Sequence, residues 1–247
     1  NRTSKGKAIN NVVQIDANEK VRAILPVEEF TENKYVVMIT EKGVIKKTSL
    51  DAFSNPRTAG IIALTTDLED GVIDAQISDG HSDIFIATKE GMSIRFEEGD
   101  VRPMGRSARG VKGITLAKDD IVVAMEIIEK DSKASILMVT SKGYGKRSSL
   151  DEYRVQGRGG SGIITQKTTD KVGIVIGTKK VYDDQDLMIS TDNGQVIRMT
   201  IASISLIGRN TQGVRLINLD DKDEVVSGIA VIKEQVPEVS ETPETSS

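Results

Sequence analysis

The sequence repeats itself with a period of about 50 residues, and this feature constrains the fold more than any other. Four segments superimpose, each ending in Thr-x-x-Gly at Gly43, Gly91, Gly143 and Gly194. These glycines are 48, 52 and 51 residues apart. Four residues after each glycine comes a cation: Lys47, Arg95, Arg147 and Arg198. A fixed period of this size predicts an array of similar units that bury their apolar faces against one another.

A second motif alternates with the first and consists of Arg, three residues and Gly. Its copies are Arg2/Gly6, Arg106/Gly110, Arg158/Gly162 and Arg209/Gly213, with Arg57/Gly60 one residue shorter. A short apolar segment, an acidic turn and another apolar run follow each copy. Because the second motif occurs five times and the first four times, we expect the chain to begin partway through a unit.

The apolar runs within each unit predict short β-strands. They are rich in Val and Ile and end at turns such as Glu41-Lys42-Gly43, where glycine can adopt a positive φ. Nearly continuous apolar runs are typical of strands covered on both faces, and no stretch keeps a helical period over three turns. We therefore predict an all-β fold whose units form the four-stranded blades of a propeller-like radial array.

The array is expected to occupy residues 1–232, as about five repeats of which the first is incomplete. The remaining residues, 233–247, contain four Glu, one Lys and two Pro, and no apolar residue larger than Val. Such a segment cannot bury enough apolar surface to offset the entropy of ordering it. We predict that it forms a disordered acidic C-terminal tail.

Composition excludes several kinds of site. The chain has no Cys and a single His, His81, which rules out disulfides, thiolate metal sites, a Cys nucleophile and imidazole clusters. The acidic turns lack the ligand spacing of a calcium loop, so we predict no metal site. No apolar run reaches the ~18 residues of a membrane helix, and the N-terminus lacks a signal core. We expect a cytoplasmic chain with no membrane partner.

The distribution of charge is more informative than the net charge of −4. Without the tail the repeat region has a net charge near −1, and cations and acids occupy different repeat positions. If equivalent positions share one rim, the cations form a belt that can follow a bent polyanion through its phosphates. The alternative is that these cations are solvated charges that guard strand edges against aggregation.

Several motifs resemble the C-terminal domain of the A subunit of bacterial DNA gyrase. They are Arg2-Thr3-Ser4-Lys5-Gly6-Lys7, the segment 102–113, Gly143-Tyr144-Gly145-Lys146-Arg147 and the segment 208–216. The resemblance extends over residues 1–232 and implies a β-pinwheel, in which neighbouring blades exchange strands and duplex DNA wraps around a basic perimeter. It also implies two protein partners, the remainder of the gyrase A subunit plus the gyrase B subunit, and a holoenzyme that uses ATP to introduce negative supercoils.

The resemblance implies no catalysis by this chain alone. The family's Tyr nucleophile, its acidic Mg²⁺ cluster and its nucleotide site are not among these motifs, so no cofactor is expected here, and the isolated domain is expected to be a monomer. The predicted partner is duplex DNA, bound through its backbone. The predicted contacts are Arg2, Lys5, Lys7, Lys46, Lys47, Arg57, Arg95, Arg102, Arg106, Arg109, Lys112, Lys146, Arg147, Arg158, Arg198, Arg209 and Arg215.

The family's signature box, Gln-basic-Arg-Gly-Gly-basic-Gly, has a degenerate copy in this chain. It reads Gln156-Gly157-Arg158-Gly159-Gly160-Ser161-Gly162, with Gly157 and Ser161 in place of cations. We expect Arg158 to contact DNA and do not assign the box's role in initiating wrapping to this copy. Two other interpretations are open: the equivalent domain of topoisomerase IV, and a β-propeller that serves as a protein-interaction platform.

Overall fold

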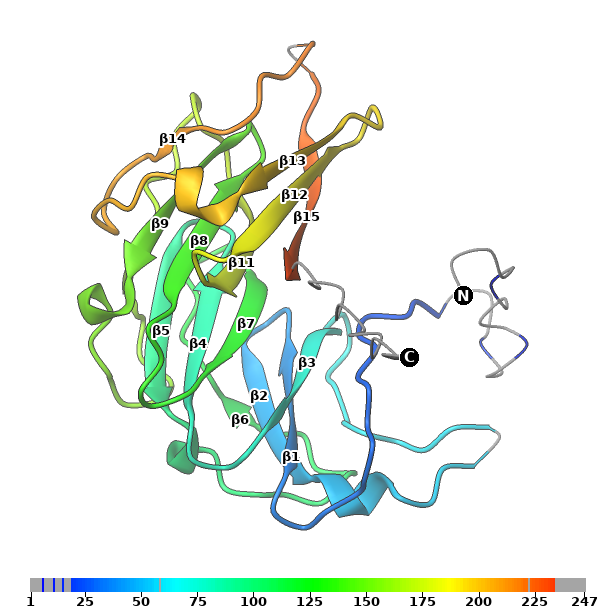
Figure 1. Ribbon diagram of the computed structural model, residues 1–247. Helices are drawn as coiled ribbons and strands as arrows, with labels where there is room; N and C mark the ends of the chain where they lie inside the picture. The colour runs from blue at the N-terminus through cyan, green and yellow to red at the C-terminus, as the bar shows by residue number, and fades with distance from the viewer. Residues whose placement is uncertain are drawn as a thin grey trace, which may run out of the picture.

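Four antiparallel β-sheets succeed one another around an axis (Figure 1). The computed structural model describes residues 6, 11, 15, 19–57, 59–221 and 223–233. In that part of the chain the only helices are single 3₁₀ turns, and none is long and apolar enough to cross a membrane. The prediction of an all-β, propeller-like repeat fold is confirmed.

Each sheet is built from a hairpin and a third strand that returns beside it. The first sheet contains β1 (Tyr35–Thr40), β2 (Val44–Ser49) and β3 (Val72–Ser78). The second contains β4 (Asp83–Thr88), β5 (Met92–Glu97) and β7 (Val122–Ile128). The third contains β8 (Ser135–Thr140), β9 (Tyr144–Ser149) and β11 (Val175–Val181). The fourth contains β12 (Gln185–Thr191), β13 (Val196–Thr200) and β15 (Val226–Lys233).

The Thr-x-x-Gly motif closes each hairpin. All four glycines have a positive φ, between 76° at Gly143 and 87° at Gly194, a conformation that residues with a Cβ rarely adopt. A 3₁₀ turn follows the second strand of every hairpin: η2 (Leu50–Phe53), η3 (Glu98–Asp100), η4 (Leu150–Glu152) and η5 (Ile201–Ser203). The repeat in the sequence is therefore a repeat of hairpin and turn.

Three short strands leave their own unit and pair with the preceding sheet. These donor strands are β6 (Val111–Lys112), β10 (Ile163–Ile164) and β14 (Val214–Arg215), and they pair with β2, β5 and β9 respectively. Neighbouring sheets thus exchange strands, as a β-pinwheel requires. Each donor strand directly follows the glycine of an Arg-x-x-x-Gly motif.

The glycine of that motif is needed because two backbones meet there. A Cβ on Gly110 would lie 2.6 Å from the carbonyl oxygen of Ile45, and one on Gly213 would lie 2.6 Å from that of Gly145. Both glycines also have a positive φ, 94° and 79°. The second sequence motif therefore marks the point at which the chain crosses to the neighbouring sheet.

The hydrophobic core is divided among the interfaces between sheets. One cluster joins the first two sheets and contains Ile39 and Ile84, and the next joins the second and third sheets and contains Phe85 and Met138. Ile84 and Phe85 are adjacent in β4 and point to opposite faces, since side chains alternate along a strand. This explains why β1, β4 and β8, the first strands of their hairpins, carry nearly continuous apolar runs instead of alternating ones.

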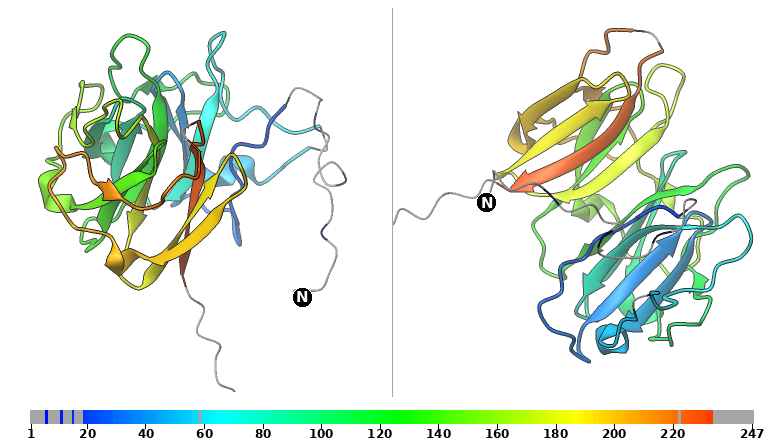
Figure 2. Two further views of the ribbon diagram at one scale, coloured as in Figure 1. Left: turned by 90° about the horizontal axis from the view of Figure 1, so that it is seen from above. Right: turned by 90° about the vertical axis from the view of Figure 1, so that its right-hand side faces the viewer.

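The returning strands β3, β7, β11 and β15 contact one another in succession and line the axis, so the donor strands lie at the outer edge. Figure 2 shows the first and fourth sheets at opposite ends of the array. β15 continues through Lys233, one residue past the boundary predicted for the tail. Residues 234–247 lie outside the described residues, and the predicted disorder stays a prediction.

We expect Gly110→Ala to lower the free energy of unfolding by about 1–3 kcal/mol more than Gly60→Ala does. Both substitutions put a Cβ on a residue with positive φ, but Gly60 has no atom within 4 Å of such a Cβ, whereas Gly110 faces the Ile45 carbonyl. Denaturant unfolding of the two variants measures the difference. Equal losses would contradict the conclusion that strand exchange requires glycine.

Candidate nucleic-acid interface

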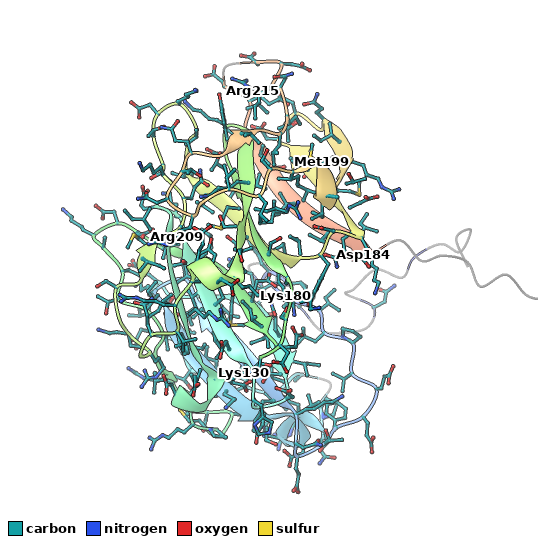
Figure 3. The ribbon with its side chains drawn as sticks, turned by 60° about the vertical axis from the view of Figure 1, so that its left-hand side comes forward. Lys130, Lys180, Asp184, Met199, Arg209 and Arg215 are labelled. Carbon is teal, nitrogen blue, oxygen red and sulfur yellow. The ribbon has the colours of Figure 1, made fainter. Side chains whose placement is uncertain are left out.

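Three loops carry the chain from one sheet to its donor strand on the preceding sheet. We call residues 101–110, 153–162 and 204–213 the bridging loops; they end at β6, β10 and β14. Because the donor strands form the outer edge of the array, the bridging loops lie along this edge as well. Figure 3 labels Arg209 on the third bridging loop and Arg215 on the donor strand that follows it.

Cations recur on the bridging loops and the donor strands. Arg102, Arg109, Lys112 and Arg215 are exposed to solvent, and Arg106, Arg158 and Arg209 are half-buried. Arg154, which the sequence analysis did not select, is also exposed. We call these residues the outer cation row: Arg102, Arg106, Arg109, Lys112, Arg154, Arg158, Arg209 and Arg215. A row of cations on successive units is the arrangement that can follow a phosphate backbone.

Two arginines of the outer cation row connect one bridging loop to the donor strand before it. Arg158 Nη1 donates to the carbonyl of Lys112, and Arg158 Nε donates to the carbonyl of Asp100 at 3.0 Å. Arg209 Nη1 donates in the same way to the carbonyl of Ile164. These bonds use part of the five N–H groups of each guanidinium. Each arginine is therefore held in position and keeps further donors for an anion.

Arg109 has a carboxylate neighbour on the surface. Its Nη1 lies 2.7 Å from Oδ1 of Asp67, and both side chains are largely exposed. An exposed ion pair contributes little to stability and exchanges readily with other partners. Arg57, on the equivalent loop of the first unit, is exposed too. Arg2, Lys5 and Lys7 lie outside the described residues.

Two of the predicted contacts, Lys46 and Lys146, lie beneath loops of this type. Both side chains are fully buried. Lys46 Nζ donates to the carbonyl of Arg106 and, at 2.7 Å, to that of Ala63. Lys146 Nζ donates to the carbonyls of Arg209 and, at 2.8 Å, Gly208. The expectation that these lysines line an outer rim is wrong, because their ammonium groups bond the loop backbone from the inside.

Burial lowers the pKa of both lysines. Desolvation lowers the pKa of Lys46, and the charge of Arg106 adds to the effect. Desolvation also lowers the pKa of Lys146 to about 8; the Arg209 charge lowers it further, and Glu152 acts in the opposite direction. The bridging loops are thus held by ammonium groups that give up a proton more easily than the ammonium group of an exposed lysine does.

Three of the four cations that lie four residues after a hairpin glycine also point inward. Lys47 Nζ lies 3.3 Å from Oε1 of Glu98, which belongs to the 3₁₀ turn of the next sheet. Arg95 Nη1 donates to the carbonyl of Leu150 at 3.2 Å, and Arg147 Nε to that of Ile204 at 2.9 Å. These contacts, which we call the inter-sheet clasp, join each of the first three hairpins to the η3, η4 or η5 region of the following sheet.

The prediction that the cations four residues after each hairpin glycine form an outer belt is therefore wrong for three of the four. Lys47 and Arg147 are buried, and the side chain of Arg95 is 14% exposed. Only Arg198, in the last sheet, is exposed; its Nε lies 2.6 Å from Oδ2 of Asp186 in its own sheet. The recurrence of these cations follows from the inter-sheet clasp. Their contact with DNA stays a prediction, and the interface proposed below does not use it.

The degenerate box lies on the second bridging loop. Its backbone makes contacts between sheets: the Gly159 N–H donates to the Gly113 carbonyl at 2.8 Å, and Thr115 N–H donates to the Gly160 carbonyl at 2.9 Å. Gly159 and Gly162 have positive φ. These glycines have a structural purpose whether or not a phosphate approaches them. Contact between Arg158 and DNA stays a prediction.

The missed Arg154 could have been found from the repeat. It lies eight residues before Gly162, and Arg102 lies eight residues before Gly110. The predicted contacts include Arg102 but not its equivalent in the next unit. Aligning the whole segment between the 3₁₀ turn and the donor strand places Arg102 and Arg154 at the same position.

The repeats also match a known family. A family model described as the DNA gyrase C-terminal domain, a β-propeller, matches residues 34–79, 82–129, 134–181 and 185–232. The chain is 41% identical over 230 residues to the A subunit of DNA gyrase from Haloquadratum walsbyi, covering 92% of this chain and 27% of the relative. It is 45% identical over 226 residues to the corresponding protein of Lawsonia intracellularis, covering 91% and 28%. The chain thus spans about a quarter of the length of these relatives.

Two solved structures have the same fold. The C-terminal domain of a DNA topoisomerase IV superimposes with a TM-score of 0.86 over 92% of this chain and 71% of that one, at 23% identity. A DNA gyrase A C-terminal domain superimposes with a TM-score of 0.82 over 93% and 76%, also at 23% identity. At this identity the likeness establishes the architecture alone.

We expect Lys146→Met to remove a pH dependence of stability above pH 8. A lysine whose pKa is lowered on folding binds fewer protons folded than unfolded, so the free energy of unfolding of the unaltered chain rises from about pH 8 towards the unfolded pKa near ~10.4. The rise is on the order of 1.4 kcal/mol per pKa unit. Denaturant unfolding across this range measures it, with exposed Lys142 changed to Met as the control. Parallel profiles for Lys146→Met and the unaltered chain would contradict this role.

Arg147→Met should lower the free energy of unfolding by about 2 kcal/mol. The carbonyl oxygen of buried Ile204 would lose the charged group that donates a hydrogen bond to it. The matched variant, Arg198→Met, alters the same repeat position where the ion pair is half-exposed, and it should cost less than about 1 kcal/mol. Thermal and denaturant unfolding of both variants provide the comparison. A loss at Arg198 as large as that at Arg147 would rule out the inter-sheet clasp as the cause.

Proposed function

Since this chain belongs to the family of DNA gyrase C-terminal domains, we propose that it binds duplex DNA along the outer cation row and bends the duplex around the array of sheets. The main support is that three successive units each place at least one exposed cation on the bridging loop or the donor strand after it, at the outer edge: Arg102 and Arg109, then Arg154, then Arg215. Each cation that neutralises a phosphate releases a counterion, and this release favours binding to any sequence.

The proposed contact is directed at the DNA backbone. The part of the chain that the structure describes contains no α-helix that could enter a major groove. Its bridging loops instead present arginines at regular intervals, with Arg158 and Arg209 already held by backbone carbonyls. Specificity would then come from how easily a given duplex bends, because the protein makes the same contacts with every sequence.

In the whole protein, we propose, this bent DNA serves a type II topoisomerase. The chain would be the C-terminal part of a gyrase A subunit. It would act in the cytoplasm with the rest of that polypeptide and with the gyrase B subunit. ATP hydrolysis and strand passage would occur elsewhere, and this chain would wrap DNA without catalysis of its own. The support is the identity of 38–45% to gyrase A subunits.

The equivalent domain of topoisomerase IV is the second candidate. It is favoured by the superposition of TM-score 0.86, but that likeness concerns the fold. The family model and the named relatives are those of gyrase. A supercoiling assay on the holoenzyme separates the two functions, since a wrapping domain supports the introduction of negative supercoils.

We expect the double variant Arg102→Ala and Arg154→Ala to weaken binding to unrelated duplexes alike. Two phosphate contacts would be lost, so the slope of log affinity against log salt concentration should fall by about 2. Fluorescence anisotropy or gel mobility shift over a salt series measures both quantities. Both side chains are exposed, so the fold should be unaffected.

The matched control removes the same charge from the axial side of the array. Lys180 and Lys233 belong to β11 and β15, strands that line the axis. Their double alanine variant should bind DNA with a nearly unchanged salt slope. If both double variants lose affinity equally, binding depends on net charge and not on the outer cation row. If neither loses affinity, the cations of the bridging loops are solvated edge charges and a protein-interaction platform becomes the better interpretation.

A further inference from the structure

The tip of each bridging loop is a sharp turn. Its central peptide bond joins the arginine of the Arg-x-x-x-Gly motif to the next residue, in the pairs Arg106-Ser107, Arg158-Gly159 and Arg209-Asn210. A trans peptide bond points its C=O and its N–H in opposite directions, and no described peptide bond is cis. The hydrogen-bond partner of one group therefore shows which way the other group faces.

A buried lysine orients this peptide bond in the third loop. Lys146 Nζ donates to the carbonyl of Arg209 and, at 2.8 Å, to that of Gly208. Thr211 Oγ1 is a third acceptor, at 3.1 Å. Because the carbonyl of Arg209 faces the interior, the N–H of Asn210 faces outward. Asn210 is exposed, and its N–H donates to no residue that the structure describes.

The first loop has the same arrangement. Lys46 Nζ donates to the carbonyl of Arg106, so the N–H of Ser107 faces outward, and Ser107 is exposed. Lys46 and Lys146 are both fully buried, and a buried ammonium group must be supplied with acceptors. Neither Ser107 nor Asn210 has a positive φ. In these two loops the buried lysine therefore determines the direction of the peptide bond above it.

The second loop, which carries the degenerate box, is turned the other way. Ile94 occupies the position at which the other two units have a lysine, and it has no group to donate to the loop. The N–H of Gly159 donates to the carbonyl of buried Gly113 at 2.8 Å, so the carbonyl of Arg158 faces outward. Gly159 has a φ of 83°, as in a type II turn, whose central peptide bond faces opposite to that of a type I turn.

We propose that the outward N–H groups of Ser107 and Asn210 each donate a hydrogen bond to a phosphate oxygen of duplex DNA, and that Lys46 and Lys146 are positioning residues for these contacts. The contacts depend on the DNA binding proposed above and assign it to particular backbone atoms. In each turn the guanidinium group belongs to the residue just before the amide, so one phosphate can receive both a charged and a neutral donor. Backbone N–H groups and arginines are the usual protein partners of DNA phosphates.

The buried ammonium group also favours an anion on the outer side of the turn. The carbonyl of the central peptide bond accepts from the ammonium group, and the N–H of the same peptide bond would donate to the phosphate. Hydrogen bonds that follow one another in this way polarise each other, which strengthens the outer bond. The ammonium group and the phosphate would thus lie at opposite ends of one aligned peptide dipole.

The three bridging loops are therefore not equivalent towards DNA. In the second loop the outward carbonyl of Arg158 carries a partial negative charge, which repels a phosphate that approaches the tip of the turn. Any phosphate contact of this loop would come from side chains, above all from exposed Arg154. The first and third loops would add a backbone donor to their arginines.

NMR of the backbone amides in the unaltered chain tests these contacts. A short duplex of arbitrary sequence is added to isotope-labelled protein in a phosphate-free buffer at neutral pH, below the pKa of Lys146 of about 8. The amide proton signals of Ser107 and Asn210 should move downfield, because a hydrogen bond to an anion deshields the proton. The signal of Gly159 should barely move.

The possible results separate this proposal from the proposed function. If the duplex binds but the Ser107 and Asn210 signals stay in place, or move no more than that of Gly159, the backbone contacts are disproved and DNA binding through side chains stands. If the duplex does not bind at all, the proposed function fails, and the backbone contacts fail with it.

Two lysine variants give a crossed test of positioning. Lys146→Met should abolish the movement of the Asn210 signal and leave that of Ser107, and Lys46→Met should do the reverse. The amide that still responds reports that the rest of the array is folded, and if one variant does not fold, the other carries the comparison. Loss of both movements in a variant that binds DNA, or loss of neither, would exclude a positioning role.

Affinity gives the size of the effect. The loss of one hydrogen bond to a charged group corresponds to binding weakened about tenfold, which is the change expected for Lys146→Met. Lys142→Met is the matched control, because it removes the same charge from an exposed position in the hairpin turn of the same sheet, and it should weaken binding much less. Equal losses in the two variants would show an effect of charge alone and overturn the positioning role.

Discussion

Neighbouring sheets are joined by the exchange of two-residue strands, and this exchange determines the path of the chain from one unit to the next. To reach the preceding sheet, the chain must leave its own unit by a loop that passes along the outer edge and ends at a glycine against a foreign carbonyl, as Gly110 does at Ile45. One requirement of backbone geometry therefore determines the Arg-x-x-x-Gly motif, the path of the bridging loops and the edge on which their arginines lie.

Cations in this protein serve two different purposes that look alike in the sequence. Lys47, Arg95 and Arg147 extend from the second strand of a hairpin to the 3₁₀ region of the next sheet, where they find carbonyl and carboxylate acceptors. Lys146 supports the backbone beneath Arg209. The cations of the bridging loops stay at the surface. Net charge cannot separate these groups, because an inner and an outer cation can lie as little as seven residues apart, as Arg147 and Arg154 do.

The architecture was predictable to a large degree, and the candidate site less so. The hairpins closed by Gly43, Gly91, Gly143 and Gly194 were located from the repeat alone, since a Thr-x-x-Gly turn after an apolar run has few alternatives. Arg106, Arg158 and Arg209 lie on bridging loops at the outer edge, and their contact with DNA stays a prediction. Lys46 and Lys146 were misplaced because a lysine in a strand gives no local sign of which face it occupies, and full burial of lysine is uncommon.

The period, the four hairpins, the all-β class and the turns that need glycine could be read from the amino-acid sequence, because they depend on contacts between residues close along the chain. Which cations form the inter-sheet clasp and which stay exposed became known from the three-dimensional structure. Those outcomes depend on segments some 50 residues apart meeting across a sheet interface, and the burial of a side chain is a property of that interface and not of its neighbours in the chain.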